Sequence, residues 1–136
     1  MRLKVALGTD HAGFEFTSEL RPWLESQGHT IIDVGAFVFD PDDDYPDFAD
    51  AVARSVSSGE VDRGLIICGS GVGACVTANK TLAVRAGICH DPYSAHQGVE
   101  HDDMNVLCLG SRIIGIEVAK EVIAIFLQLP PDYVRC

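Results

Sequence analysis

The chain has 136 residues, a length that favours a single domain spanning residues 1–136 with a core of its own. Hydrophobic residues make up 47% and charged residues 22%, and 20 acidic against 10 basic residues give a net charge of −10. No basic face is visible and no apolar stretch approaches the roughly 18 residues of a membrane helix, so neither nucleic acid nor membrane is an expected partner. A small anionic ligand remains compatible, because a few local cations and backbone amides can hold it.

The start of the chain and the cysteines indicate the compartment. Residues 1–10 lead straight into a strand-like run, without the long apolar core or cleavage site of a targeting segment. The number of cysteines is odd, and three of the five fall in apolar strand-like runs, which indicates reduced thiols in a cytoplasmic protein. The five are Cys68, Cys75, Cys89, Cys108 and Cys136.

Short apolar runs alternate with longer amphipathic segments along the whole chain. This alternation predicts an α/β protein with a parallel sheet covered by helices on both faces. Pro22 lies inside the first helical segment and predicts a kink or a break there. In chain order we expect a strand at 3–8, a helix at 13–27, a strand at 29–35, a helix at 46–58, a strand at 63–69, a helix at 72–81, a strand at 84–89, a helix at 92–100, a strand at 105–110 and a helix at 113–128.

Polar residues follow four of the five predicted strands. "TDH" follows the first, "CGSGVG" the third, "HDPYS" the fourth and "GSR" the fifth. Ligands of parallel α/β sheets bind at the carboxyl ends of the strands, so this convergence predicts a site at that edge. "EHDD" precedes the fifth strand and is expected at the opposite end of its own sheet, unless its loop reaches back.

The loop after the third strand carries Gly69, Gly71 and Gly73. Its free amides and the following helix favour an anion, but the pattern is neither a Walker loop nor a full dinucleotide fingerprint. A tight strand–helix turn explains the glycines equally well.

Cys68 ends the third strand, next to the predicted helix N-terminus. That position lowers a thiol pKa, and a thiolate there could act as a base or a nucleophile. A buried, inert thiol is the alternative, and we assign Cys75, Cys89 and Cys108 to it.

Three further positions are candidates for contacts with a ligand. Asp10 can accept from sugar hydroxyls and His11 can donate to a phosphate, although Asp10 could equally cap the following helix. His101, beside Asp102, could act as an acid or could be a solvated loop residue.

The remaining charged and imidazole side chains are less specific. Arg112 is either an anion clamp or a surface cation, and Arg85 is expected to cap or pair. The spacing of His90, His96 and His101 matches no zinc pattern, so no metal site is expected.

Six ordered segments resemble motifs of the ribose-5-phosphate isomerase B family, which also includes the galactose-6-phosphate isomerase subunits. They are "GTDHAGFE", "DYPDFADAVA", "GLIICGSGVGACVTANK", "RAGICHDPYSA", "EHDDMNVLCLGSR" and "EVAKEVI", and the resemblance runs from residue 5 to about residue 127. It implies a three-layer Rossmann-like fold with the strand order of the flavodoxin type. It also implies a homodimer, sometimes a tetramer, that builds each active site from two subunits. The implied reaction interconverts aldose and ketose phosphates without a metal or an organic cofactor.

The resemblance also implies residue roles. Cys68 matches the base that moves a proton between C1 and C2 of the sugar, whereas some relatives use a Glu at the place of Ala74. His101 matches the imidazole that opens the sugar ring in the partner's site. Ser70 and the amides of Gly69, Gly71 and Gly73 match the anion hole, Asp10 and Tyr45 match sugar contacts, and His11, Arg112 and Arg135 match phosphate contacts.

Two departures bear on the substrate. Relatives usually carry Asn where this chain has Asp102, and a second phosphate-binding arginine usually follows the position of Arg135. Our leading hypothesis is isomerisation of ribose 5-phosphate to ribulose 5-phosphate. The alternatives are the same chemistry on a tetrose or hexose phosphate or on an unphosphorylated or acidic sugar, and a partner-dependent or non-catalytic subunit.

Overall fold

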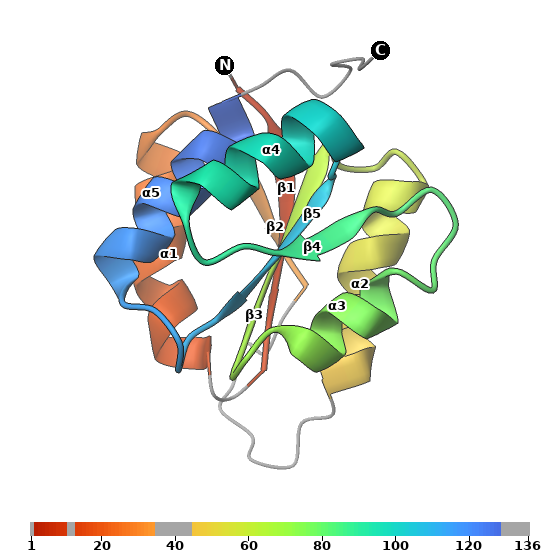
Figure 1. The fold of residues 1–136 in the computed structure, drawn as a ribbon, viewed down its shortest axis with the longest axis horizontal. Helices are drawn as coiled ribbons and strands as arrows, with labels where there is room; N and C mark the ends of the chain where they lie inside the picture. Colours follow the sequence, from red (N-terminus) through yellow and green to blue (C-terminus); the bar gives the residue numbers. More distant parts are fainter. Residues whose placement is uncertain (1, 11–12, 35–44, 129–136) are drawn as a thin grey trace.

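A five-stranded parallel sheet forms the centre of the molecule, with the strand order β2-β1-β3-β5-β4 (Figure 1). The computed structural model describes residues 2–10, 13–34 and 45–128, and for 45–47 only the backbone. The strands are β1 (Lys4–Thr9), β2 (Thr30–Asp33), β3 (Arg63–Cys68), β4 (Ala86–Ile88) and β5 (Val106–Gly110).

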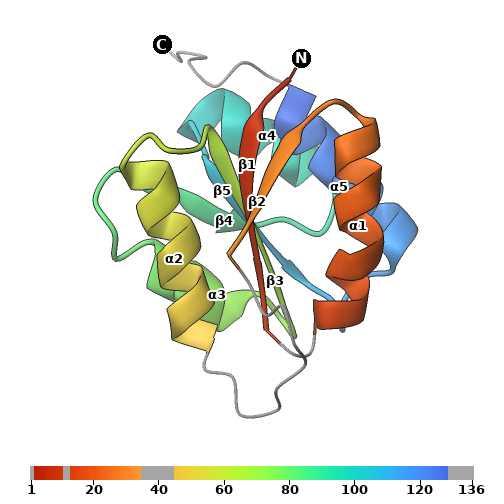
Figure 2. The same cartoon turned by 180° about the vertical axis from the view of Figure 1, so that it is seen from behind.

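The helices cover both faces of this sheet, which confirms the predicted three-layer α/β/α class. α1, α4 and α5 lie on one face and α2 and α3 on the other (Figures 1 and 2). The helices are α1 (Phe14–Ser26), α2 (Tyr45–Ser57), α3 (Val72–Ala78), α4 (Pro92–Asp102) and α5 (Ile116–Gln128).

The strand order differs from the flavodoxin type that we expected. That type runs 2-1-3-4-5, whereas here β5 lies beside β3 and β4 occupies the edge. The burial of the two strands explains the exchange. Every residue of β5 is buried, as a central strand requires, whereas β4 has three residues and Ile88 is exposed. A short, partly exposed strand suits an edge.

Alternate residues of the central strands feed two separate hydrophobic cores. Leu7, Leu65 and Leu107 point to the side of α1, α4 and α5, while Ile66 and Cys108 point to α2 and α3. Because both faces are covered, the strands read as continuous apolar runs, which is why the sequence located them within a few residues.

Helix α1 runs without interruption through Pro22, so the predicted break is wrong. Proline removes only its own N–H, the one that would bond to the carbonyl of Ser18, and both residues are exposed to water. Leu20 and Leu24 are fully buried on either side of the proline and hold both halves of the helix against the sheet.

The sheet topology brings the loops after β1, β3 and β5 together at one edge of the sheet. β1 has β2 on one side and β3 on the other, so the strand order reverses between β1 and β3. The carboxyl ends of β1, β3 and β5 are therefore neighbours, and the loops that follow them meet. In the described part of the chain, no helix is long and apolar enough to cross a membrane.

Replacing Pro22 by Ala restores the helical N–H toward the Ser18 carbonyl. We expect the free energy of unfolding to rise by about 1–3 kcal/mol, the usual cost of an internal proline, measured by guanidinium denaturation. An unchanged or lower stability would show that the proline shapes α1 in a way that its packing needs.

Candidate active site

A cleft of about 520 Å³ opens at the carboxyl ends of β1, β3 and β5. It brings together six of the residues that the sequence singled out, from three separate segments. The lining residues are Asp10, Cys68, Gly69, Ser70, Gly73, Ala74, Arg112 and Ile113. The predicted convergence at this edge is confirmed for these segments.

The glycine loop wraps around the Cys68 sulfur. The N–H of Gly71 donates to Cys68 Sγ at 3.2 Å, and the N–H of Val72 donates to Ser70 Oγ at 3.3 Å. Gly71 has φ of +86°, in the left-handed region that glycine adopts without a steric penalty. The amide of Gly73, which lines the cleft, has no acceptor among the described residues.

The turn after β5 packs its backbone directly on this loop. The N–H of Ser111 donates to the carbonyl of Cys68 at 2.7 Å, and the N–H of Arg112 donates to the carbonyl of Gly69 at 3.1 Å. A Cβ at Gly110 would lie 2.8 Å from the Gly69 oxygen and from Ser70 Cα, so only glycine fits there. This contact carries Arg112 to the mouth of the cleft.

His90 holds the same turn from its other side, a role that the sequence did not reveal. Its Nε2 accepts the N–H of Gly110 at 2.9 Å, which leaves the ring proton of the neutral imidazole on Nδ1. The available signal is that His90 opens "HDPYS", directly after the fourth predicted strand and at the edge where the site is expected. His90 therefore positions the backbone that positions Arg112.

Burial raises the pKa of the Cys68 thiol above its ordinary value of 9.0. The amides of Gly71, Ala74 and Ser70 act in the opposite direction, and the Asp10 carboxylate raises the pKa further. We expected the helix N-terminus to lower the pKa of Cys68, and this expectation is wrong, because the pKa is raised overall. Only 6% of the Cys68 surface is exposed, so the loss of water destabilises the thiolate more than the hydrogen bonds from the backbone amides stabilise it.

Asp10 and Arg112 place opposite charges in the cleft. Asp10 Oδ1 accepts the N–H of Gly13 at 3.0 Å, in the turn that leads into α1, so the carboxylate is fixed. The N-cap of α1 is Gly13 and receives no side-chain cap, so the expectation that Asp10 caps this helix is wrong. Arg112 is exposed and, among the described residues, has no carboxylate partner. It is the cation that an anionic ligand would meet in this cleft.

His101 and Asp102 lie far from this cleft. Both are at the C-terminal end of α4, near the amino ends of the strands, where Arg85 pairs with Asp103 at 3.3 Å (Figure 1). Asp102 lines a different groove, of about 440 Å³, between α4 and the β4 edge. The expectation that this segment lies at the opposite end of the sheet is confirmed, and so is the pairing of Arg85.

Three of the predicted contact residues cannot be placed. His11 and Arg135 lie outside the described residues, and Tyr45 is the first residue of α2, with a side chain that is not described. Their roles stay predictions.

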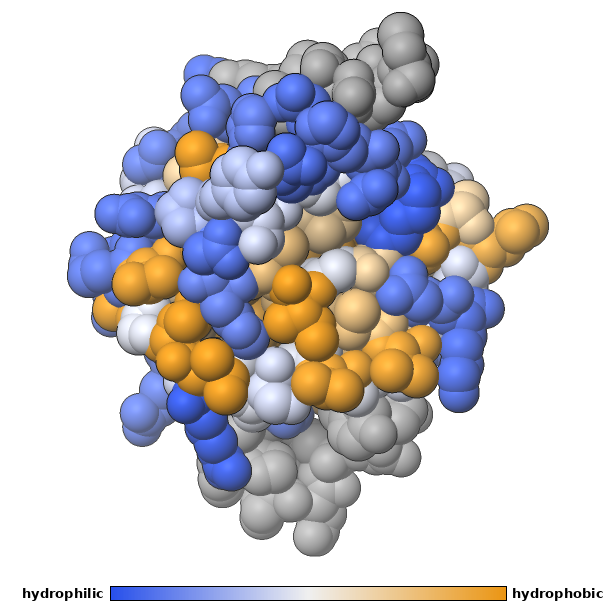
Figure 3. Space-filling model, viewed as in Figure 1, coloured by the Kyte–Doolittle hydropathy of each residue, from blue (hydrophilic) through white to orange (hydrophobic). Residues whose placement is uncertain are grey.

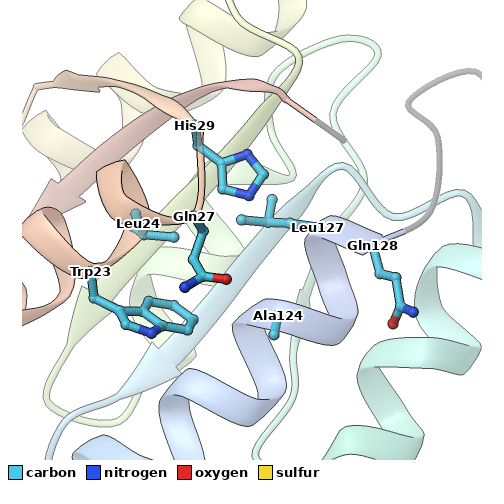
Figure 4. Close-up of a pocket in the computed structure, with 7 residues that line it drawn as sticks. All are labelled: Trp23, Leu24, Gln27, His29, Ala124, Leu127 and Gln128. Atoms are coloured by element: carbon cyan, nitrogen blue, oxygen red, sulfur yellow. The ribbon is translucent and has the colours of Figure 1, made fainter.

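A second pocket, of about 180 Å³, lies between α1, the start of β2 and α5 (Figure 4). Trp23, Gln27 and His29 line it together with Leu127. His29 Nδ1 accepts the N–H of Leu3 at 3.2 Å, and burial lowers the pKa of this imidazole, so it stays neutral and structural. This pocket is at the amino ends of the strands, away from Cys68.

The other described cysteines divide into two kinds. Burial raises the pKa of Cys89 to about 11, as expected for an inert packing thiol. The interaction with Cys75, followed by burial, raises the pKa of Cys108 well above 9.0. Cys75 departs from our assignment, because hydrogen bonds from Cys108 and Asn79 lower its pKa to about 7.

Known proteins are similar to this chain over most of its length. The family profile described as Ribose/Galactose Isomerase matches residues 5–135. The chain is 44% identical over 124 residues to ribose-5-phosphate isomerase B of Escherichia coli, which covers 91% of this chain and 83% of that protein. It is 40% identical over 134 residues to D-erythrulose-4-phosphate isomerase 2 of Mycolicibacterium smegmatis, with 97% and 88% covered. The chain belongs to the ribose/galactose isomerase family.

Solved structures agree with this membership. The type B ribose 5-phosphate isomerase of Trypanosoma brucei matches with a TM-score of 0.90 and 40% identity, covering 96% of this chain and 88% of that one. Ribose-5-phosphate isomerase B of Mycoplasma genitalium, solved with bound ribulose-5-phosphate, matches with a TM-score of 0.87 and 35% identity, covering 92% and 83%. The protein is thus an aldose–ketose isomerase of the sugar-phosphate class.

The electrostatics of the cleft predict how Cys68 reacts with iodoacetamide. In the wild type the alkylation rate should reach half its maximum above pH 9.0, because burial and Asp10 both disfavour the thiolate. Asp10→Asn keeps an oxygen for the Gly13 N–H but removes the charge, so the midpoint should move to lower pH. Peptide mass spectrometry of Cys68 at a series of pH values measures this. Asp62→Asn is the control and should leave the midpoint unchanged, because the Asp62 carboxylate accepts the backbone N–H of Lys4 at the other end of the sheet. An Asp10→Asn midpoint equal to that of the wild type would contradict the argument.

Proposed function

We propose that this isomerase converts ribose 5-phosphate to ribulose 5-phosphate, with Cys68 as the base that transfers the proton. The observation that carries the proposal is the position of the Cys68 sulfur. Cys68 lines the same cleft as Asp10, a carboxylate that can accept hydrogen bonds from sugar hydroxyls, and Arg112, a cation without a carboxylate partner among the described residues. Backbone N–H groups surround the sulfur.

The chemistry explains why such a site suits this reaction. The open-chain aldose has a weakly acidic C2–H next to its carbonyl, and removing it leaves negative charge on the carbonyl oxygen. The Cys68 thiolate takes the C2 proton and an enediolate forms with the negative charge on O1. The hydroxyl proton of O2 passes to O1, and the Cys68 thiol returns its proton to C1, which leaves the carbonyl on C2. The raised pKa of Cys68 makes the thiolate a strong base once it forms, and kcat/KM should therefore rise as the pH increases toward that pKa.

Donors for the enediolate come from the same loop. The Gly71 amide already bonds to the sulfur, so we assign the developing oxyanion to the Gly73 amide, together with Gly69 and the Ser70 hydroxyl. Donors that are fixed before the reaction stabilise charge in the transition state without reorganisation, and each typically contributes about 10²- to 10³-fold in turnover.

We assign the phosphate to Arg112, and propose that His11 and Arg135 contribute from segments outside the described residues. Asp10 and Tyr45 would accept from or donate to the sugar hydroxyls. The net charge of −10 is compatible with this assignment. The attraction between the phosphate and a guanidinium in direct contact is stronger than the repulsion from distant carboxylates, which salt and water screen over about 10 Å.

We propose that the protein forms a homodimer, or a tetramer of two such dimers, and that each active site is built from two subunits. Hydrophobic side chains gather on the face seen in Figure 3. The exposed large hydrophobic residues of the described chain include Val72 and Val76 of α3, Ile88 of β4, and Ile113 just before α5. A two-fold axis through this face reverses the sheet in the second subunit. The end of α4 in one subunit then approaches the Cys68 cleft of the other, and His101 of the partner subunit can open the sugar ring there.

A tetrose phosphate is the second candidate substrate. The relative from Mycolicibacterium smegmatis is a D-erythrulose-4-phosphate isomerase, and Asp102 stands beside the proposed ring-opening histidine. An ionised Asp only accepts hydrogen bonds, and its charge repels a nearby phosphate, which changes how the sugar chain is recognised.

The four described cysteines are unpaired, which supports a reducing compartment, and we propose a cytoplasmic location.

A panel of sugars tests the substrate, and Cys68→Ala tests the base. We expect turnover of ribose 5-phosphate well above that of D-erythrulose 4-phosphate, galactose 6-phosphate and unphosphorylated ribose. Cys68→Ala should lose about 10²- to 10⁴-fold in C2 proton exchange, followed by NMR in deuterated water, while substrate binding stays nearly intact. Cys89→Ala is the matched control and should exchange normally. Good turnover of another sugar with none of ribose 5-phosphate would exclude the first substrate.

Mixing two inactive variants tests the shared site. In a dimer of Cys68→Ala with His101→Ala, one site keeps Cys68 of one chain and His101 of the other, whereas the second site lacks both. Random exchange of subunits should therefore restore about one quarter of the wild-type activity, since half the dimers are mixed and each has one intact site. No recovery, with mixed dimers shown by native mass spectrometry, would mean that His101 acts within its own chain, whereas an active His101→Ala variant would mean that His101 has no role in the reaction.

A further inference from the structure

The last turn of α4, which carries His101, ends on a residue with an unfavourable backbone conformation. Asp103 follows the helix directly and has φ of +52°, in the left-handed region that favours glycine. Its N–H donates to the carbonyl of Val99 at 3.2 Å, and the N–H of Met104 donates to the carbonyl of Gly98 at 3.0 Å. The helix is thus closed by a residue whose backbone the surrounding structure must hold in place.

Arg85, just before β4, holds Asp103 from the neighbouring segment of the chain. Its Nε donates to the carbonyl oxygen of Asp103 at 2.6 Å, and its Nη2 lies 3.3 Å from the Asp103 carboxylate. Its Nη1 donates to the carbonyl of Ala83 at 3.0 Å. Ala83 has φ of +68°, so one guanidinium binds the carbonyls of both non-glycine residues with a positive φ in the described part of the chain.

The backbone of Arg85 is itself fixed by Asn105, the residue before β5. The Arg85 N–H donates to Asn105 Oδ1 at 2.8 Å, and the Arg85 carbonyl accepts the N–H of Asn105 at 3.0 Å. Asn105 Nδ2 donates to the Ala83 carbonyl at 3.0 Å, which is the same oxygen that Arg85 binds. The guanidinium therefore extends from a fixed point and joins the end of α4 to the amino ends of β4 and β5.

The inner side of the same turn is closed by Met104, which is buried. Its side chain lies against Gly87 of β4 and Gly98 of α4, where larger residues leave no room. A Cβ at Gly87 would lie 2.7 Å from Met104 Sδ, and a Cβ at Gly98 would lie 3.0 Å from Met104 Cε. The end of α4 is thus held by apolar packing on its inner side and by Arg85 on its outer side.

The contacts of Arg85 fix a direction more than they stabilise the fold. The Arg85 and Asp103 side chains are 45% and 51% exposed, so water and salt screen their attraction and the ion pair adds little to the free energy of unfolding. The planar guanidinium binds three oxygens in fixed directions, which the single ammonium of a lysine does not reproduce. His101 is exposed and lies two residues before Asp103, so its place depends on where this turn ends.

We propose that Arg85 is a positioning residue of the isomerase, which fixes the end of α4 so that His101 reaches the sugar in the site of the neighbouring subunit. This role rests on the proposed function, in which the His101 imidazole opens the sugar ring across the subunit interface. Arg85 acts through the backbone of Asp103 and touches no substrate. A misplacement of about 1 Å at a reacting group can cost about 10²-fold in rate, so the loss of Arg85 should slow ring opening while proton transfer at Cys68 continues.

The two sugars of the reaction separate ring opening from proton transfer. Ribose 5-phosphate closes to a furanose through its free O4, so the ring must open before C2 can lose its proton. Ribulose 5-phosphate would need O5 to close a furanose, and O5 carries the phosphate, so this sugar stays open-chain. Exchange of its C1 proton with solvent therefore requires the base, Cys68, but not the ring-opening residue, His101.

Arg85→Ala and Arg85→Lys test this separation in the full chain. We expect turnover of ribose 5-phosphate to fall about 10- to 100-fold, while C1 exchange of ribulose 5-phosphate, followed by NMR in deuterated water, stays near the wild-type rate. Arg85→Lys should lose nearly as much as Arg85→Ala, because the charge alone does not hold both carbonyls. Arg54→Ala removes another exposed arginine ion pair, on α2, and is the control that should leave both rates unchanged. Equal losses of both rates, or full turnover in Arg85→Lys, would overturn the proposal.

Subunit mixing tests whether Arg85 acts on the same side of the site as His101. A mixed dimer of Arg85→Ala with Cys68→Ala has one site with Cys68 from the first chain and an intact α4 end from the second. Its mixture should therefore recover about one quarter of the wild-type turnover of ribose 5-phosphate. The mixture of Arg85→Ala with His101→Ala should stay at the level of Arg85→Ala, because every site lacks either His101 or its support.

The mixture of Cys68→Ala with His101→Ala is the reference for these measurements. If the reference recovers, then no recovery of Arg85→Ala with Cys68→Ala, or a gain of activity with His101→Ala, would overturn the role of Arg85 alone. If the reference itself does not recover, the shared site of the proposed function fails, and the role of Arg85 across the interface fails with it.

Discussion

The contact between two backbone turns, the one after β3 and the one after β5, shapes the cleft at the carboxyl edge of the sheet. Gly110 lets the second turn lie against Gly69 and Ser70, and the hydrogen bond from Ser111 to the Cys68 carbonyl fixes the separation. The direction of the Cys68 thiol, the orientation of its amide donors and the position of Arg112 all follow from this one contact. His90 supports it from behind by accepting the Gly110 amide.

Solvent exclusion and hydrogen bonding compete at the two thiols of this segment, and the balance differs. At Cys68 desolvation exceeds the effect of the backbone amides, and the Asp10 carboxylate adds to it, so the pKa rises. At Cys75 side-chain donors from Cys108 and Asn79 exceed the desolvation, so the pKa falls. Two cysteines that look alike in "CGSGVGAC" therefore have pKa values shifted in opposite directions, because tertiary neighbours decide the environment of each sulfur.

Several features could be predicted from the sequence because their causes are local or follow directly from the topology. Continuous apolar runs marked the strands, and amphipathic spacing marked the helices. The rule that parallel strands present their carboxyl ends together placed Asp10, Cys68 and Arg112 in one cleft, and the same rule placed His101 at the opposite end. The break at Pro22 was predicted wrongly, since the burial of Leu20 and Leu24 is not visible in a local propensity.

The sequence by itself determined the α/β class, the edge of the sheet that bears the site and the identity of the thiol there, since periodicity and chain direction are properties of the chain alone. Only the tertiary structure decided the order of β4 and β5, the net sign of the Cys68 pKa shift, the supporting role of His90 and the lowered pKa of Cys75. Each of these depends on which residues distant in sequence become neighbours, and on how much water they exclude. Desolvation and hydrogen bonding act across such contacts, and no local pattern records them.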